Sequence, residues 1–469
     1  MSILSHDTFW NAVISLPSTK KMLQLSLGKC SACGRTALEA ALDDYVGSVG
    51  SKCDKCGFYS FVIRFWMEFL RRSLGVRKEK IAKLFSDPNA RIAIANITKS
   101  FTYFGIRKPL SIYAPFLVVW DFTHKCNLSC RHCYSDSGVP SKNELATREA
   151  LAVVDQLADF GVTALAFSGG EPLTRNDFFE VANHAVERGL YVSVATNGTL
   201  LSRENVKRLK KIGVNYVEVS IDGANSKSHD GFRGVPGAFA KAVDGLKTCV
   251  EEDLCVCIAT TATKSNIGEI PEILDLAAEI GAERFTYFNF IPAGRGKEIC
   301  SEDLSAQERE SLMGFLLQRI LKGNKVTILT TAPQLARVAL QCQSGNGEIA
   351  MSMAHMQTAK VSRRAGALAG FIGGCGAGRL YCSISPQGDV HPCVFLQINV
   401  GNLREEKFRD VWLNSKLFNS LRNRANLTGA CGKCDFKFIC GGCRARAFAY
   451  NGDMLSSDPG CVMSQGASA

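Results

Sequence analysis

The sequence has no long hydrophobic run and no recognisable export signal. No uninterrupted apolar stretch reaches the roughly 18 residues that a membrane-spanning helix needs, which argues against an integral membrane protein built on helices. The first residues, MSILSHDTFWNAVISLPSTKK, lack the basic start and the small-residue cleavage site of a secretory signal. We therefore expect a cytoplasmic protein.

Charged residues are also sparse. They make up 21% of the 469 residues, whereas 46% are hydrophobic. This balance excludes a disordered chain, and the length is sufficient for several domains of about 100–200 residues. The net charge of +11 indicates an anionic partner, or it serves only to keep the protein soluble. We expect no nucleic acid among the partners.

Cysteine, in contrast, is abundant. Because no export signal is present, 20 cysteines favour metal ligation over a disulfide scaffold. Three groups stand out: Cys30, Cys33, Cys53 and Cys56; then Cys126, Cys130 and Cys133; and finally Cys375, Cys382, Cys393, Cys431, Cys434, Cys440, Cys443 and Cys461. The other five are scattered, and we predict that they are small buried hydrophobic residues: Cys249, Cys255, Cys257, Cys300 and Cys342.

Between the first and last cysteine groups, apolar runs alternate with stretches of helical periodicity. The runs are rich in β-branched and aromatic residues and occupy 116–123, 163–170, 191–198, 216–223, 255–263 and 284–294. Strands that alternate with helices are joined by right-handed crossovers and form a parallel sheet. Six such units predict an α/β fold, a partial (β/α)6 TIM-like barrel. Sites in such barrels form at the carboxyl ends of the strands, where the Cys126 group would lie.

Small and polar residues follow the next three strands at the same end. They are Gly169, Gly170 and Glu171 after the second strand, Asn197 after the third, and Ser220 and Asp222 after the fourth. Glycines allow close backbone approach, and Glu171 offers an acceptor for an ammonium group. Each feature alone is common at strand ends. Together with a three-cysteine loop, they predict a ligand site.

The spacing Cys126-x3-Cys130-x2-Cys133 after the first strand, followed by GGEP at 169–172, resembles the radical S-adenosylmethionine (radical SAM) superfamily. The resemblance implies that three thiolates hold a 4Fe–4S cluster whose fourth iron binds the amino and carboxylate groups of S-adenosylmethionine. One electron then breaks a carbon–sulfur bond, and the 5′-deoxyadenosyl radical abstracts hydrogen from the substrate. A structural zinc site is the alternative for these cysteines.

The same resemblance assigns further residues to S-adenosylmethionine. It implies that residues 169–171 bind the methionine amino group. Ser220 and Asn197 would lie near the ribose and the carboxylate, and Arg233 in GFRG would be a carboxylate partner.

The last cysteine group has its own motifs. A hairpin turn centred on Gly388 lies between Cys375 and Cys393, and CGKCDFKFICGGC follows at 431–443. This order resembles a SPASM extension, which holds two auxiliary iron–sulfur clusters, although the family usually has three residues, not two, between the last two cysteines of the motif. The resemblance gives one cluster Cys431, Cys434, Cys440 and Cys461, and the other Cys375, Cys393 and Cys443, with Cys382 as a candidate fourth ligand. Three 4Fe–4S clusters are then expected, and a pair of zinc sites is the alternative.

Within SPASM proteins, CGGCRARAFAYNGDMLSSDPGC and FIPAGRG resemble the branch that trims tetrapyrrole side chains in alternative haem biosynthesis. Relatives that mature sulfatases carry an acid directly after the cysteine that matches Cys393. Here Val394 stands in that position, which disfavours oxidation of a protein serine or cysteine.

The N-terminal cysteines predict a separate metal module. Two C-x2-C pairs, 19 residues apart, are typical of a zinc ribbon or a rubredoxin-like site that holds one iron or zinc. The helix predicted after Cys56 has a broad apolar face of Phe58, Phe61, Phe65, Trp66, Phe69 and Leu70, and a face with Arg64, Glu68, Arg71 and Arg72. Such a helix can lie on an anionic membrane surface. Alternatively, it covers the barrel.

We predict four regions: a metal module at 1–110, the barrel at 111–300, a helical and Met-rich bridge at 301–369, and an auxiliary-cluster domain at 370–469. A Gly-, Ala- and Met-rich stretch at 344–374 joins the bridge to the auxiliary-cluster domain, and it lines a substrate channel or serves only as a linker.

Three substrate classes are compatible with these patterns. The leading hypothesis is radical carbon–carbon chemistry on a large hydrophobic isoprenoid lipid. It rests on a resemblance of the N-terminal module to archaeal tetraether-lipid radical SAM enzymes. The alternatives are side-chain decarboxylation or deacetylation of a tetrapyrrole, and modification of a peptide. In each case we expect a reducing electron donor of the ferredoxin or flavodoxin type. An electron carrier without enzymatic activity would not need the GGEP segment.

Overall fold

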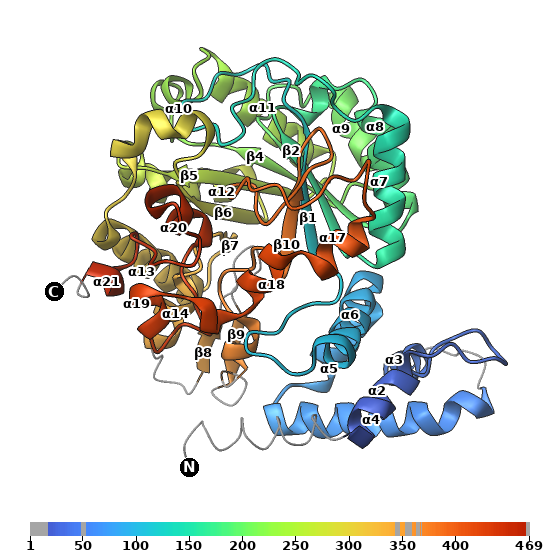
Figure 1. The fold of residues 1–469 in the computed structure, drawn as a ribbon. Coiled ribbons are helices and arrows are strands. Elements are labelled where there is room, and N and C mark those ends of the chain that lie inside the picture. Colours follow the sequence, from blue (N-terminus) through green and yellow to red (C-terminus); the bar gives the residue numbers. More distant parts are fainter. Residues whose placement is uncertain are drawn as a thin grey trace.

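The protein is described here from a computed structural model, which covers residues 17–47, 53–342, 348–351, 359–362, 366 and 368–465. Its core is a parallel sheet with helices on its outer face (Figure 1). The first seven strands are β1 (Leu117–Thr123), β2 (Ala164–Gly169), β3 (Tyr191–Thr196), β4 (Tyr216–Ser220), β5 (Val256–Ala262), β6 (Arg284–Asn289) and β7 (Thr327–Thr330). The six predicted strands are confirmed, and β7 extends the barrel beyond its predicted end.

Two strands from the C-terminal region complete the sheet. The strand β10 (Tyr381–Ile384) pairs in parallel with β1, and β11 (Val390–His391) pairs antiparallel with β10. The sheet order is therefore β11-β10-β1-β2-β3-β4-β5-β6-β7, with β11 and β7 at its two edges. The C-terminal region is thus built into the barrel.

Amphipathic helices cover the outside of the barrel. They are α7 (Thr147–Phe160), α8 (Phe178–Glu187), α9 (Arg203–Ile212), α10 (Ser226–Arg233), α11 (Ala238–Glu251), α12 (Ile270–Ile280), α13 (Ala306–Lys322) and α14 (Leu335–Gln341). In α9, for example, Val206 and Leu209 are fully buried while Lys207 and Lys210 are exposed. Because strands covered on both faces bury every side chain, the barrel strands appear in the sequence as continuous apolar runs.

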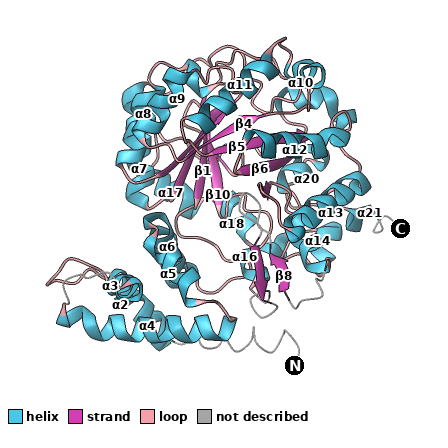
Figure 2. Cartoon of the chain, turned by 180° about the vertical axis from the view of Figure 1, so that it is seen from behind, coloured by secondary structure: helices cyan, strands magenta, loops and turns pink. Residues whose placement is uncertain are grey.

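The N-terminal region forms a helical module beside the barrel (Figures 1 and 2). Its helices are α2 (Pro17–Leu27), α3 (Ala37–Val46), α4 (Asp54–Leu74), α5 (Lys78–Ser86) and α6 (Pro88–Phe104). The α6 helix joins the module to the barrel, since the Asn96 side chain donates a hydrogen bond of 2.6 Å to the Gly161 carbonyl at the end of α7. The α4 helix packs on α3 and α2, so the alternative that it covers the barrel is wrong.

The bridge is only partly as predicted. Besides α13 and α14 it contributes β7 to the sheet, and then a hairpin of β8 (Glu348–Met351) and β9 (Ala359–Ser362). Most of the Met-rich stretch, including Met353 and Met356, lies outside the described residues. The predicted substrate channel in this stretch therefore stays a prediction.

The C-terminal region consists of short helices around the last cysteines. They are α16 (Ala369–Ile372), α17 (Phe408–Asn414), α18 (Lys416–Arg422), α19 (Gly429–Lys433), α20 (Arg444–Asn451) and α21 (Val462–Gln465). Within the described part of the chain, no helix is long and apolar enough to cross a membrane.

The scattered cysteines differ in burial. Cys249 and Cys257 are buried as predicted, and Cys255 is half-buried. The prediction is wrong for Cys300 and Cys342, which are exposed.

Candidate active site and metal centres

The loop after β1 carries Cys126, Cys130 and Cys133 to the mouth of the barrel. Backbone hydrogen bonds hold this loop on two sides, from Arg131 N–H to the Phe232 carbonyl (3.1 Å) and from Arg295 N–H to the Cys133 carbonyl (3.0 Å). All three cysteines line one cavity of about 210 Å³ that opens into the barrel.

Each of these sulfurs has a hydrogen-bond donor. The Leu128 N–H lies 3.5 Å from Cys126 Sγ, the Ser137 N–H lies 3.4 Å from Cys133 Sγ, and Arg233 Nη1 lies 3.7 Å from Cys130 Sγ. Burial raises the pKa of Cys126 to about 11, so a thiolate here requires the positive charge of a metal. Three thiolates with N–H donors form a donor set that fits an iron–sulfur cluster.

Gly169, the last residue of β2, and Gly170 allow the cysteine loop to pack closely against this strand end. A Cβ atom at Gly169 would lie 2.6 Å from the Thr123 carbonyl oxygen, and one at Gly170 would lie 2.2 Å from that of Lys125. The Gly170 N–H donates to Thr123 and the Glu171 N–H to Lys125, at 2.7 and 2.8 Å. Close backbone approach is confirmed, and the approaching backbone is that of the cysteine loop itself.

Glu171 is fully buried and links β2 to the end of β3. Its carboxylate accepts hydrogen bonds from Thr196 Oγ1 (2.9 Å) and from the Asn197 N–H (2.8 Å), and it does not line the cavity. Burial raises the pKa of Glu171 to about 7. The Asn197 side chain in turn donates to Asn127 Oδ1 in the cysteine loop (2.8 Å). The assignment of Glu171 to the methionine amino group stays a prediction.

Asp222 and Arg233 form a buried ion pair at the same mouth. Arg233 Nη2 lies 2.5 Å from Asp222 Oδ2, and His132 Nε2 lies 3.4 Å from that same oxygen. Burial alone would raise the pKa of Asp222, but the charge of Arg233, together with His132, His229 and the Thr261 N–H, lowers that pKa. Arg233 also lines the cavity, as do Ser220 and Asn197. The structure therefore brings these predicted residues together with the three cysteines.

His132 and Arg295 were missed from the sequence. The His132 ring stacks on Phe232 with centroids 4.2 Å apart, and Arg295 Nε donates to the Cys130 carbonyl at 3.1 Å. Both line the cavity. His132 lies within the cysteine motif and Arg295 within AGRG. Their positions in these motifs are what could have marked them as site residues in the sequence.

Elsewhere the cavity wall combines apolar side chains with polar ones, among them Tyr134, Ser168, Glu218, Thr286 and Asn289. The Tyr134 hydroxyl donates a hydrogen bond of 2.7 Å to buried Asp121. Glu218 on β4 also lines the cavity, and burial raises its pKa to about 7. Val394 and Phe395 close one wall, so the C-terminal region contributes directly to this cavity.

Two smaller cavities are lined by the C-terminal cysteines. One has Cys375, Cys393 and Cys443 in its wall, and it shares Asn289, Ile291 and Phe395 with the main cavity. The other is lined by Cys431, Cys434, Cys440 and Cys461. These two groups are the two ligand sets that the SPASM resemblance implied.

Buried arginines surround these cavities. Arg444 Nη2 lies 3.4 Å from Cys431 Sγ, and Arg424 Nη2 donates to the Cys375 carbonyl at 2.6 Å. Because thiolate-bound clusters carry negative charge, buried guanidinium groups suit cluster binding here.

Cys382 does not join the other three cysteines of its predicted set. It lies on β10 next to Tyr381, and successive residues of a strand point to opposite faces. Tyr381 lines the cavity, whereas Cys382 packs in the main hydrophobic core. The geometry does not support Cys382 as a fourth ligand.

Replacing Cys382 should therefore leave the metal content unchanged. We expect the variant Cys382→Ala to retain the iron of the reconstituted wild type, whereas Cys375→Ala loses iron. Iron and sulfide analysis after anaerobic reconstitution measures both variants. Equal iron loss in both would return Cys382 to the ligand set.

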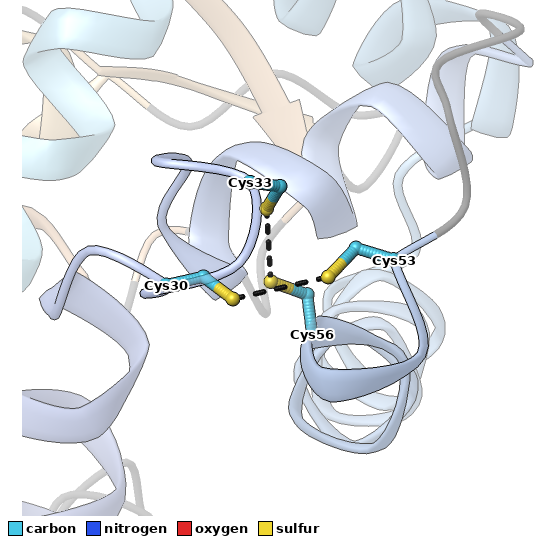
Figure 3. A group of neighbouring side chains, drawn as sticks. All are labelled: Cys30, Cys33, Cys53 and Cys56. Carbon is cyan, nitrogen blue, oxygen red and sulfur yellow. Dashed lines mark hydrogen bonds between the residues drawn. The ribbon is translucent and has the colours of Figure 1, made fainter.

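The N-terminal cysteines form a four-cysteine metal site (Figure 3). All four sulfurs lie within 4.8 Å of one another, with 3.8 Å between Cys30 and Cys53 and 3.5 Å between Cys33 and Cys56. A tetrahedral site with metal–sulfur bonds of about 2.3 Å requires sulfurs about 3.8 Å apart. The arrangement therefore fits one zinc or iron ion.

A parallel barrel with a three-cysteine loop at its mouth, next to a cysteine-rich C-terminal region, defines the class of radical SAM enzymes that carry auxiliary iron–sulfur sites. Residues 120–277 match the family described as the radical SAM superfamily, and residues 375–435 match SPASM, an iron–sulfur cluster-binding domain. The chain belongs to the radical SAM superfamily and carries a C-terminal SPASM domain. It is therefore an enzyme that uses S-adenosylmethionine and 4Fe–4S clusters.

Similar proteins are found among both curated sequences and solved structures. The AdoMet-dependent heme synthase of Methanosarcina barkeri is 39% identical over 356 residues, which are 75% of this chain and 98% of that protein. The Fe-coproporphyrin III synthase of the same organism is 36% identical over 367 residues, 74% of this chain and 88% of that protein. The crystal structure of Streptococcus suis SuiB bound to S-adenosylmethionine superposes with a TM-score of 0.62 at 18% identity and covers 92% of this chain and 93% of that chain. This last likeness concerns the fold alone.

Proposed function

We propose that this enzyme modifies a side chain of a tetrapyrrole by radical decarboxylation. The observation that carries the proposal is the similarity to a heme synthase and an Fe-coproporphyrin III synthase, at 39% and 36% identity over about three quarters of the chain. These comparisons support the tetrapyrrole hypothesis better than the leading sequence-based hypothesis of isoprenoid lipid chemistry.

The barrel mouth would hold the reactive groups. Cys126, Cys130 and Cys133 would bind three irons of a 4Fe–4S cluster and leave the fourth iron for S-adenosylmethionine. When bound, this pair supplies a 5′-deoxyadenosyl radical that removes a hydrogen atom from carbon. The Asp222–Arg233 pair, which touches Cys130 through Arg233, would fix the loop relative to β4.

Other residues of the mouth would position S-adenosylmethionine. Gly169 and Gly170 would hold its amino end, and Asn197 and Ser220 its ribose and carboxylate. Glu171 would act by fixing the Asn197 backbone, to which it is hydrogen-bonded. Arg233 is the candidate for a charge contact with the carboxylate.

The deeper cavity would take the substrate. Its apolar wall, with Phe288, Val394 and Phe395, suits a flat hydrophobic macrocycle. Decarboxylation of a propionate to a vinyl group releases carbon dioxide and one electron after hydrogen abstraction. Cys375, Cys393 and Cys443 would hold an electron acceptor directly behind this wall, because their cavity shares Phe395 with the main one.

The complete enzyme would contain three 4Fe–4S clusters and one iron or zinc ion at the N-terminal site. Radical SAM enzymes need a reductant, and a ferredoxin or flavodoxin would supply the electron here.

A substrate comparison under anaerobic conditions tests the proposal. We expect reconstituted enzyme with S-adenosylmethionine and dithionite to convert Fe-coproporphyrin III into products lighter by one carbon dioxide and two hydrogen atoms for each propionate converted, as seen by mass spectrometry. Parallel reactions contain an isoprenoid lipid extract or a peptide pool from the host. New products from the lipid or the peptides, with unchanged Fe-coproporphyrin III, would overturn the proposal.

A further inference from the structure

The α4 helix carries an exposed aromatic face that no step of the proposed reaction uses. This face consists of Phe58, Phe61, Phe65, Trp66 and Phe69, whose residues are 71%, 62%, 62%, 37% and 44% exposed. Their spacing places them along one side of the helix. Trp66 makes edge-on ring contacts with Phe65 and Phe69 at centroid distances of 6.4 and 5.8 Å. The five aromatic rings therefore lie in a strip along one side of the helix, and the last three of them are in contact.

The other side of α4 is fixed within the module. Ile63 and Met67 pack against a small core that includes Leu38, Leu42 and Phe85. Glu68 accepts hydrogen bonds from Arg71 and Tyr45 on this inner side. The orientation of the helix is thus determined by packing, and the aromatic face points outward as a result.

The position of α4 leaves this face accessible. Figures 1 and 2 show α4 along the edge of the molecule, with α2 and α3 on the side toward the barrel. Among the described residues, those of α2 and α3 are its main packing partners. The aromatic residues span Phe58 to Phe69, 12 of the 21 residues of α4, so the strip is about 18 Å long at 1.5 Å per residue.

Basic side chains border the strip at its C-terminal end. Residues 54–86 contain eight Lys and Arg but only three Asp and Glu. Those exposed near the end of α4 and on α5 are Arg72, Arg77, Lys78, Lys80 and Lys83. A second copy of this chain would bring the same positive charges together. An anionic lipid surface satisfies both features, because it accepts aromatic rings and attracts Lys and Arg.

We propose that the aromatic face of α4 docks the enzyme on an anionic lipid bilayer, with the helix lying in the plane of the interface. The rings would enter the boundary between headgroups and acyl chains, and the basic residues of α5 would contact the phosphates. Attachment of this kind is peripheral and reversible.

Vesicle flotation with the reconstituted full-length enzyme tests this inference. We expect the wild type to float with vesicles of equimolar phosphatidylcholine and phosphatidylglycerol at low salt, and much less with pure phosphatidylcholine. The triple variant Phe58→Ser, Phe61→Ser and Phe65→Ser should partition at least about a hundredfold more weakly, since three largely exposed rings no longer enter the lipid. Substitution of Arg77, Lys80 and Lys83 by Gln should cost about a hundredfold on the anionic vesicles alone.

Two controls separate this effect from misfolding. The variant Phe448→Ser removes an exposed aromatic side chain on the C-terminal domain, and it should float as the wild type does. All variants should form 5′-deoxyadenosine at the wild-type rate without vesicles.

Three outcomes would overturn the inference. The first is a wild type that ignores anionic vesicles at low salt, and the second is a serine triple variant that floats normally. The third is sedimentation of the lipid-free wild type as a dimer that the serine variant abolishes, which would assign the face to a second copy.

Discussion

A variant with alanine at Cys126, Cys130 and Cys133 is expected to form no 5′-deoxyadenosine from S-adenosylmethionine under strong reductant. The three sulfurs line one cavity, and each has its own hydrogen-bond donor. Without them no cluster remains to deliver the electron that breaks the carbon–sulfur bond. Enzymatic rate enhancements exceed about 10⁶-fold, so the loss should reach the detection limit of product analysis by chromatography.

The control is the double variant Cys300→Ala and Cys342→Ala. It removes two exposed cysteines that belong to none of the predicted ligand sets. It should cleave S-adenosylmethionine normally. The triple variant should also contain about four fewer irons per chain than the wild type. Retained cleavage in the triple variant would show that another site carries the chemistry.

The second large effect concerns the buried Asp222–Arg233 pair. We expect Arg233→Leu to lower the free energy of unfolding by about 3–5 kcal/mol, because Asp222 is left as a buried charge without its main partner. The double variant Arg233→Leu and Asp222→Asn should recover part of this loss, since it removes the unpaired charge. Urea unfolding followed by circular dichroism under anaerobic conditions measures both.

The pH dependence of this effect has a definite sign. In the wild type Arg233 lowers the pKa of Asp222 against burial, so the pair stabilises the fold above the ordinary pKa of a carboxyl group and this stabilisation is lost as pH falls. In Arg233→Leu, burial raises the pKa of Asp222 above that of the unfolded chain. The folded variant therefore loses stability as pH rises, because Asp222 must either stay protonated or carry a buried charge. The gap between wild type and variant should therefore widen as pH rises. A gap that is constant with pH would mean that the charge of Asp222 is not the cause.

The six barrel strands could be predicted from the sequence because burial on both faces produces uninterrupted apolar runs. The short strand β7 was missed, since Thr327–Thr330 offers only four residues among polar neighbours. The pairing of β10 with β1 was also missed. It joins Leu117 to Tyr381, and no local pattern reports a contact across so long a separation.

The candidate site was predicted in composition but not in contacts. Spacing alone grouped the thiols, yet it could not reveal that Cys382 packs in the main hydrophobic core while Tyr381 faces the cavity. It also could not reveal that the Glu171 carboxylate is already bonded to Thr196 and Asn197. Such directions depend on the register of packed strands, which forms only in the folded chain.

The sequence also could not decide between the two roles predicted for the helix after Cys56, which were binding to a membrane surface and covering the barrel. The aromatic residues of α4 were recognised from the sequence, but whether they cover the barrel depends on where α3 and α6 place the helix. The exposed rings support the proposal that the enzyme docks on a membrane, and they say nothing of its substrate. The proposed substrate rests on the similarity to a heme synthase.

If a radical formed at the Cys126 loop acts on a tetrapyrrole side chain, the hydrogen that it removes should be found in 5′-deoxyadenosine, and deuterium labelling detects this transfer. Fe-coproporphyrin III carrying deuterium on its propionate side chains would be incubated anaerobically with reconstituted enzyme, S-adenosylmethionine and reductant. We expect the 5′-deoxyadenosine to contain deuterium, in an amount proportional to the carbon dioxide that the macrocycle loses. Unlabelled 5′-deoxyadenosine, formed at the same rate with and without the tetrapyrrole, would contradict it.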